Sequence, residues 1–217
     1  MAREIVRGSR ASIEFDAVRC IHSRHCVLDR PDVFVPNVEG EWIRPDAATP
    51  EELVALARGC PSGAIVARRS DGGPDEAAPR VNTLRVLENG PLAARAPLTI
   101  DGEDAGLRAT LCRCGRSEHK PYCDGSHAAA GFAATGEPQA RSSAPLASRA
   151  GPLAVTPLLD GPLKLAGPVE VISGTGHTLD RATELYLCRC GRSRDKPYCD
   201  GSHKAAGFTA PGFARGR

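Results

Sequence analysis

Nine cysteines give this chain its strongest chemical signal, because they fall into three groups of three. The groups are Cys20, Cys26 and Cys60; Cys112, Cys114 and Cys123; and Cys188, Cys190 and Cys199. The number of cysteines is odd, and the first residues lack the apolar core of a signal peptide. Both observations argue against a disulfide framework. Clustered thiolates are typical metal ligands, so we expect three metal or metal–sulfide sites.

Two of these groups belong to an internal repeat. Residues 112–132 read CRCGRSEHKPYCDGSHAAAGF, and residues 188–208 read CRCGRSRDKPYCDGSHKAAGF, 76 residues further along. The copies differ at three pairs of positions: Glu118 and Arg194, His119 and Asp195, and Ala128 and Lys204. Two copies favour one symmetric unit over a solenoid, which usually needs three or more repeats.

Each repeat offers two pairs of metal-binding side chains. Cys123 and His127 are four residues apart, so one helical turn places both on the same face. Cys112 and Cys114 lie one residue apart, where we expect a strand to end. Two pairs of ligands suit the two irons of a [2Fe–2S] cluster. Zinc is the competing interpretation, but its paired cysteines are usually separated by two to four residues, so we favour iron and sulfide.

The spacing C-x-C-x2-S-x3-P-x-C-D-G-S-H resembles the signature of the CDGSH iron–sulfur domain, or NEET, family. The resemblance implies that Cys112 and Cys114 bind an inner iron, while Cys123 and His127 bind an outer, more exposed iron. Cys188, Cys190, Cys199 and His203 would take the same roles in the second repeat. Many family members are homodimers with one cluster per chain. The tandem motif is similar to members with both halves fused, which implies a monomer with an internal pseudo-dimer.

The histidine ligand has redox consequences. Three thiolates and two sulfides around two ferric irons leave one negative charge, one fewer than four thiolates would leave. Neutral imidazole therefore raises the potential above the value near −400 mV typical of plant ferredoxins, and we expect it to lie below the two-histidine Rieske range of about −150 to +300 mV. A proton on the second ring nitrogen would make the potential fall with rising pH. Acid should release the cluster.

The amino-terminal group has a different pattern. Cys20 and Cys26 frame a short loop, and Cys60 precedes a proline. Bacterial ferredoxins place a third cysteine in such a loop, where this chain has Ser23. Three cysteines suit a [3Fe–4S] cluster, which we favour, or a [4Fe–4S] cluster with a fourth ligand. The candidates for that ligand are His22, first of all, then Ser23 and His25. The segment resembles single-cluster ferredoxins and the divergent mono-cluster domain that often accompanies CDGSH motifs.

The elements around these sites predict an α+β fold. Thr49-Pro50-Glu51-Glu52 is a capping box that opens a helix ending at Gly59. Short strands lead into Cys112 and Cys188. We expect a small ferredoxin-like α+β domain at residues 1–68. Two mostly-β CDGSH repeats, at 81–133 and 150–217, would form a pseudo-twofold NEET-like unit. The stretches 69–79 and 134–149 are polar and turn-rich, which is typical of linkers.

The composition of the chain argues against several classes of function. Basic and acidic residues number 28 and 26, and no basic block or long apolar run occurs, so we expect neither nucleic-acid binding nor a membrane span. We expect a cytoplasmic protein. No nucleophile–base pair or phosphate loop predicts catalysis. The main hypothesis is an electron-transfer protein that serves a redox partner protein. The alternative is a cluster carrier, store or redox sensor that serves apo-protein acceptors, and a zinc-bound structural module is a third possibility.

Overall fold

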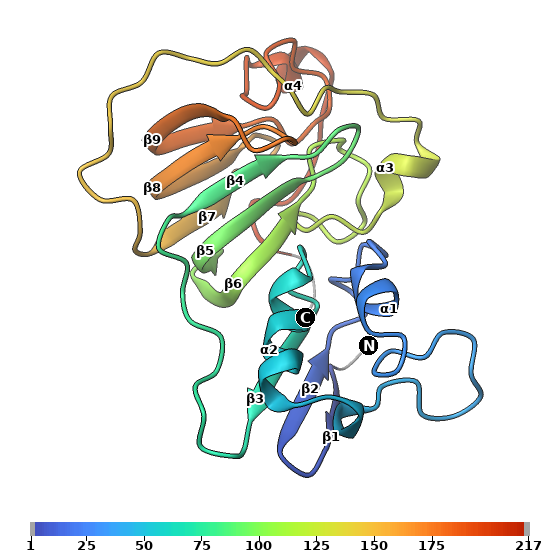
Figure 1. Cartoon of the computed structure of the whole chain (residues 1–217). Helices are drawn as coiled ribbons and strands as arrows, with labels where there is room; N and C mark the ends of the chain where they lie inside the picture. Colours follow the sequence, from blue (N-terminus) through green and yellow to red (C-terminus); the bar gives the residue numbers. More distant parts are fainter. Residues whose placement is uncertain (1–2, 215–217) are drawn as a thin grey trace. The chain divides into compact units, whose positions relative to one another are not determined.

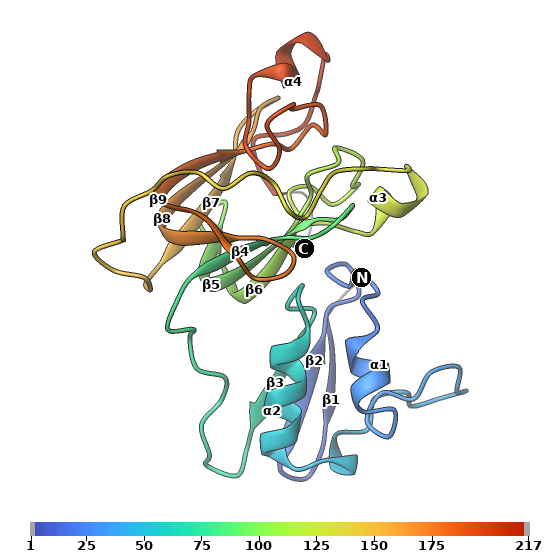
Figure 2. The ribbon, with the colours of Figure 1, turned by 45° about the horizontal axis from the view of Figure 1, so that its top comes forward.

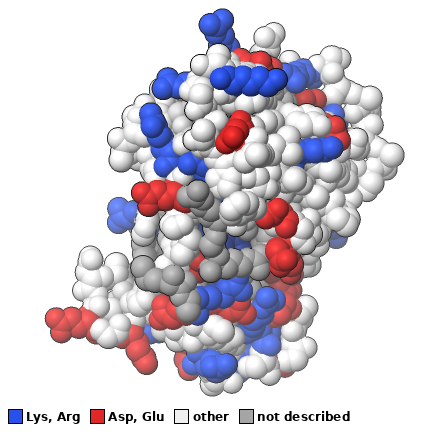
Figure 3. Space-filling view, turned by 180° about the vertical axis from the view of Figure 1, so that it is seen from behind, with Lys and Arg blue, Asp and Glu red and all other residues white. Residues whose placement is uncertain are grey.

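The computed structural model describes residues 3–214, which form two compact units. Within the described residues, one unit comprises 3–77 and the other 78–214. Strands predominate and helices are few and short, so the predicted mixture of α and β structure is confirmed. None of the helices within the described residues has the length and apolar character needed to cross a membrane. Figure 3 shows a face on which acidic and basic side chains are interspersed.

The first unit contains a three-stranded antiparallel sheet in the order β1-β2-β3 (Figure 1). Its elements are β1 (Glu4–Arg7), β2 (Ala11–Phe15), α1 (His25–Asp29), a 3-10 turn (Pro45–Ala47), α2 (Pro50–Gly59) and β3 (Ile65–Arg69). The register pairs Val6 with Ile13, and Ile13 with Ala67. Helix α2 packs against one face of the sheet (Figure 2), and Phe34, Ile43 and Leu53 are buried with Ile13.

Helix α2 begins as the sequence predicts. Thr49 accepts a hydrogen bond from the Glu52 backbone N–H, and the Glu52 side chain accepts one from the Thr49 backbone N–H. This reciprocal pair satisfies two amide groups that the first turn would otherwise leave without partners. The helix ends at Gly59, and Cys60 follows at once. Local sequence therefore fixes the point at which the chain leaves the helix, at Cys60.

The second unit is built around a six-stranded sheet. Its elements are β4 (Thr83–Val86), β5 (Leu92–Ile100), β6 (Glu103–Leu111), α3 (Ser126–Ala129), β7 (Leu153–Pro157), β8 (Leu163–Ile172), β9 (Thr178–Leu187) and α4 (Ser202–Ala205). Residues alternate between buried and partly exposed along the whole of β5, as expected for a strand with one face toward a core. Both repeats contribute to this single core, through residues such as Leu92, Leu111, Leu163 and Leu187.

Strands from the two repeats exchange partners. β4 pairs with β5 of its own repeat in an antiparallel manner and with β8 of the other repeat in a parallel manner. β7 follows the same pattern: it pairs antiparallel with β8 of its own repeat and parallel with β5 of the other repeat. The hairpins β5–β6 and β8–β9 extend from this arrangement (Figure 2). Each repeat therefore completes its sheet with a strand of the other.

The stretch predicted as the second linker is tied to the sheet along its length. Residues 133–152 contain no helix or strand and run outside β8 and β9 (Figure 1). The Arg141 backbone N–H donates to the Leu179 carbonyl at 2.7 Å, and the Asn82 N–H donates to the Arg149 carbonyl at 2.7 Å. Ser143 accepts a hydrogen bond from the Arg181 N–H. This segment therefore covers part of the second repeat.

Candidate metal centres

The two cysteines that flank each motif loop are brought together by backbone pairing. In the first repeat, the Cys112 N–H donates to the Pro121 carbonyl at 2.8 Å, and the Cys123 N–H donates to the Thr110 carbonyl at 2.9 Å. In the second repeat the corresponding bonds join Cys188 to Pro197, at 2.8 Å, and Cys199 to Tyr186, at 2.9 Å. The loop thus folds back on the end of β6 or β9, where Leu111 pairs with Tyr122 and Leu187 pairs with Tyr198, and this pairing sets the positions of the first and last cysteines.

A short turn then presents the histidine. Gly125 has a φ of +88°, a backbone conformation that favours glycine, and Asp124 accepts hydrogen bonds from the Ser126 N–H and hydroxyl. Helix α3 begins at Ser126, and it places His127 Nδ1 3.3 Å from Cys123 Sγ. Gly201 and α4 repeat this arrangement, with His203 Nδ1 3.4 Å from Cys199 Sγ.

The spacing of the side chains fits tetrahedral metal coordination. Two thiolates on one tetrahedral metal, each about 2.3 Å away, lie about 3.8 Å apart, and a thiolate and an imidazole nitrogen lie about 3.5 Å apart. The two leading sulfurs of each motif are separated by 3.6 Å in the first repeat and 3.8 Å in the second. The cysteine–histidine pairs, at 3.3 and 3.4 Å, also fit.

The donors are grouped in pairs. Within residues 3–214, no three His, Cys, Asp or Glu side chains are placed to hold one metal ion together. In a [2Fe–2S] cluster each iron takes two protein ligands and two bridging sulfides, so two separate pairs are the arrangement required. The residues predicted to ligate the clusters are therefore brought together as two pairs in each repeat.

Burial and mutual contact shift the pKa values of the predicted ligands in different directions. In the first repeat, the contact between the two leading sulfurs lowers the pKa of Cys112 to about 6 and raises the pKa of Cys114. Burial raises the pKa of Cys123 to about 12. Burial also lowers the pKa of His127, which favours the neutral imidazole that a metal requires. Cys114 and Cys123 therefore favour the protonated thiol, and a metal that binds there has to displace the protons.

Hydrogen bonds to sulfur come from the backbone. The Arg116 N–H lies 3.4 Å from Cys114 Sγ, and the Gly125 N–H lies 3.4 Å from Cys123 Sγ. Ser117 and Ser126 carry hydroxyl groups that could contact sulfur or stabilise turns. Ser117 donates to the Tyr122 carbonyl, and Ser126 donates to Asp124, so both hydroxyls stabilise turns.

Two buried arginines were not anticipated from the sequence. Arg113 and Arg189, each between the two leading cysteines of its motif, are both only 1% exposed. Arg113 donates to the backbone carbonyls of Gly90, Thr135, Leu87 and Ala134, and Arg189 donates to those of Gly161, Pro211 and Leu158. Each guanidinium also lies over a phenylalanine ring, Phe132 or Phe208, at 5.5 Å. The identical CRCG in both repeats was the available signal.

These arginines act across the two repeats. The charge of Arg113 interacts with Cys188 of the other repeat, and the charge of Arg189 interacts with Cys112. Glu88 and Asp160 are the carboxylates that also favour the charged forms. Burial lowers the pKa of Arg113 to about 10, a value at which the guanidinium stays charged at neutral pH. The cation of Arg113 therefore acts on the first cysteine of the opposite motif.

The first unit gathers its three cysteines around one cavity of about 730 Å³. Cys20, Cys26 and Cys60 line it, and their charges interact with one another. The candidates for the fourth ligand, His22, Ser23 and His25, also line this cavity. Burial raises the pKa of Cys20 and of Cys26. The residues predicted to hold a cluster in this unit therefore line one cavity.

Comparison with known proteins places these sites in the class of iron–sulfur proteins. Residues 89–128 and 160–204 match the family described as iron-binding zinc finger, CDGSH type. Residues 6–70 match the family described as divergent 4Fe-4S mono-cluster. The chain thus contains two segments that match a CDGSH-type family and one that matches a divergent mono-cluster family, which confirms the resemblances inferred from the cysteine motifs.

Two curated relatives share the CDGSH segment. They are the "CDGSH iron-sulfur domain-containing protein 2 homolog" of Trichoplax adhaerens and the protein of the same name from Drosophila ananassae. Each is 59% identical over 29 residues, which is 13% of this chain and 21% or 22% of the relative. The chain therefore spans about a fifth of the length of the curated relatives it matches.

Proposed function

We propose that this chain is an electron-transfer protein with three iron–sulfur clusters. Two would be [2Fe–2S] clusters, each on three cysteines and one histidine, and the third would lie in the cavity of the first unit. The observation that carries the proposal is the pairing of donors in both repeats, at separations of 3.3–3.8 Å that suit tetrahedral iron. When bound, such clusters exchange single electrons.

The two repeats would form a pseudo-twofold pair. Strands β4 and β7 are exchanged reciprocally, and the backbone of each motif loop contacts the other loop. This arrangement supports an internal dimer within a monomeric chain. It would hold the two [2Fe–2S] sites at a fixed separation, as an electron relay requires.

The chain's own residues would set the redox properties of the [2Fe–2S] sites. His127 and His203 are half-buried, so the ring nitrogen opposite each Nδ1 can exchange a proton with solvent. The backbone N–H groups on sulfur and the buried Arg113 and Arg189 stabilise negative charge, and both raise the potential. We expect a potential between those of plant ferredoxins and Rieske centres.

For the first unit we propose a [3Fe–4S] cluster on Cys20, Cys26 and Cys60, because these are the three thiolates that line the cavity. The matched family's description names a four-iron cluster, which would need a fourth ligand such as His22. We expect the protein to act in the cytoplasm, with a redox partner protein.

Metal and sulfide analysis of protein purified without oxygen tests the proposal. Two [2Fe–2S] clusters and one [3Fe–4S] cluster predict seven irons and eight acid-labile sulfides per chain. Mössbauer and EPR spectra assign the cluster types, and the potential should fall as pH rises. Colourless protein that contains zinc and no labile sulfide would overturn the assignment.

A second candidate function is transfer of clusters to apo-proteins. The half-buried His127 and His203 favour it, because a ligand that acid can reach allows the cluster to leave. Mixing the holo-protein with an apo-ferredoxin separates the two functions. Electron exchange that is faster than cluster transfer supports a carrier of electrons, and the reverse order supports a carrier of clusters.

A further inference from the structure

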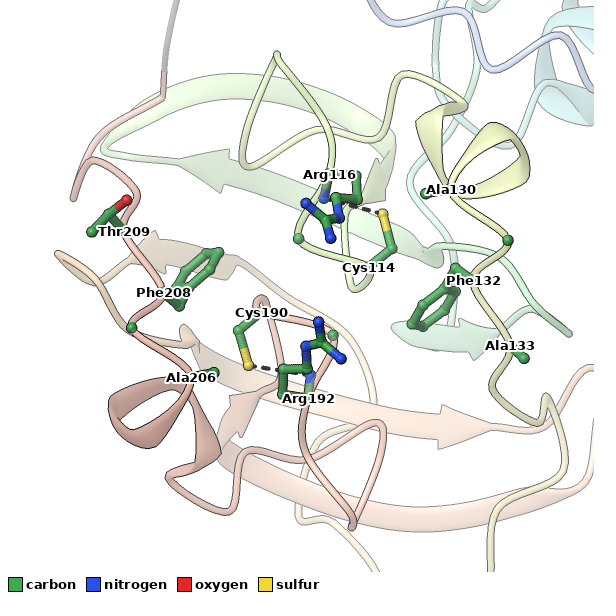
Figure 4. A pocket seen from close by; sticks show the side chains of 14 residues that line it. Cys114, Arg116, Ala130, Phe132, Ala133, Cys190, Arg192, Ala206, Phe208 and Thr209 are labelled. Atoms are coloured by element: carbon green, nitrogen blue, oxygen red, sulfur yellow. Dashed lines mark hydrogen bonds between the residues drawn. The ribbon is translucent and has the colours of Figure 1, made fainter.

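The motif loops of the two repeats enclose a cavity of about 500 Å³ (Figure 4). This volume lies within the range of about 300–1,000 Å³ that is usual for small-molecule sites. Each repeat supplies matching lining residues: its second cysteine, the glycine and arginine that follow, and a phenylalanine. These residues are Cys114, Gly115, Arg116 and Phe132, with Cys190, Gly191, Arg192 and Phe208. Neither repeat could form the cavity alone.

The cavity is cationic. Arg116 and Arg192 are the two acidic or basic side chains among its lining residues, and both guanidinium groups extend into the space between the loops (Figure 4). Both side chains are exposed, and within residues 3–214 neither forms an ion pair. Arg69 and Arg149 elsewhere in the chain are held by carboxylates. Two cations that face one cavity raise its electrostatic potential and attract anions.

The geometry of the donors indicates the kind of anion. A guanidinium presents a planar fork of N–H donors that matches a carboxylate or phosphate group. Arg116 and Arg192 come from opposite halves of the unit, so one small molecule with an acidic group at each end could engage both. Gly115 and Gly191, which precede the two arginines, also line the cavity, and they add no side chains to its wall.

We propose that this cavity binds a small dianion with two acidic groups, and that binding is linked to the redox state of the protein. The linkage rests on the proposed function, since Cys114 and Cys190 line the cavity and are expected cluster ligands. Each electron that enters a cluster adds negative charge beside the bound anion. The anion therefore binds the oxidised protein more tightly, and by reciprocity it lowers the reduction potential.

Calorimetry on the oxidised holo-protein tests binding. Succinate and pyrophosphate serve as the carboxylate and phosphate probes, sodium chloride holds the ionic strength constant, and visible absorbance verifies that the clusters stay intact. We expect saturable binding of one molecule per chain. The double variant Arg116→Gln and Arg192→Gln should bind at least tenfold more weakly. Arg194→Gln, a matched loss of an exposed arginine outside the cavity, should bind as wild type does.

Electrochemistry tests the linkage. If the oxidised protein binds the anion tenfold more tightly, saturating anion lowers a one-electron midpoint potential by about 59 mV. The double variant should show no such shift. Absence of saturable binding by both probes, or equal binding by wild type and double variant, would overturn the site. An unchanged potential at saturation would overturn the linkage. Failure of the proposed function would show separately, as missing labile sulfide.

Discussion

Gly115 faces the backbone of Cys190 so closely that a Cβ atom at Gly115 would lie 2.7 Å from the Cys190 carbonyl oxygen. The contact is reciprocal, since a Cβ atom at Gly191 would lie 2.5 Å from the carbonyl oxygen of Cys114. Both glycines also have positive φ, +80° and +77°. The two motif loops therefore touch through backbone, at the residue next to an expected cluster ligand.

Gly115→Ala should separate the loops and destabilise the second unit. The left-handed backbone alone should cost about 1–2 kcal/mol, and the steric clash about 1–3 kcal/mol more. Gly102→Ala is the matched control, because Gly102 has nearly the same φ, +79°, and open space around its Cβ position. Chemical denaturation of both variants measures the difference. Equal losses of unfolding free energy would contradict a close approach of the loops.

Replacing Arg113 should separate its structural role from its charge. Arg113→Met removes the donor to the buried Gly90 carbonyl and to three part-buried hydrogen bonds, and we expect a loss of about 3–5 kcal/mol in unfolding free energy. Arg113→Lys keeps the cation, so its reduction potential should lie closer to the wild-type value than that of Arg113→Met. Voltammetry measures the potentials. If both variants have the wild-type potential, the charge of Arg113 does not act on the clusters.

The second repeat should hold its cluster longer than the first. Arg141 lies over the Tyr198 ring at 3.4 Å and pairs with Asp195, where the first repeat has His119. Tyr198 directly precedes the expected ligand Cys199, and its hydroxyl donates to Asp180 at 2.9 Å. Arg141→Ala should speed cluster loss from the second site about two- to tenfold, and leave the first site unchanged.

Cluster loss can be followed by visible absorbance, in variants that keep the cysteines of one repeat. Arg194→Ala serves as the control, since it removes an exposed arginine of the same repeat that has no ion pair within the described residues. If the two sites lose their clusters at one rate in the wild type, the segment that carries Arg141 does not protect the second site.

Ser23→Cys should change the type of cluster in the first unit. Ser23 lines the cavity between Cys20 and Cys26, where ferredoxins have a cysteine, so the variant offers a fourth thiolate. We expect wild type to contain three irons at this site and the variant four. Mössbauer spectra report the difference, with the exposed Ser70→Cys as the control for an added thiol. A four-iron cluster in wild type would mean that another residue already binds the fourth iron.

His127→Cys should lower the potential of the first [2Fe–2S] site. The added thiolate makes the site one unit more negative, and it removes the ring nitrogen that can carry a proton. We therefore expect a lower potential that depends less on pH, toward the value near −400 mV of four-cysteine sites. Potentials measured between pH 6 and 8 test this. If the potential of the variant depends on pH as steeply as that of the wild type, the proton that accompanies reduction binds to another group.

Local chemistry was predictable from the sequence, because it depends on neighbouring residues. The capping box at Thr49 predicted the start of α2, and Gly59 predicted its end. The spacing of Cys123 and His127 predicted that they would lie together, and a single helical turn brings this about.

Long-range features were not predictable in the same way. The alternation of buried and exposed residues in β4 and β7 does not indicate which repeat each strand pairs with. That choice depends on strands far along the chain. Arg113 has the side chain of a solvated surface residue, and its burial depends on carbonyl groups from four distant positions. Residues 134–149 have the composition of a linker, yet their backbone bonds to the sheet.

The exchange of β4 and β7 has a consequence for biosynthesis. The first repeat lacks a partner for the end of β5 until β7 has been translated. The second repeat likewise lacks a partner for the end of β8 unless β4 of the first repeat is present. The sheet of the second unit can therefore close only after most of the chain has been synthesised, and a chain that stalls before β7 would leave the end of β5 unpaired on that side.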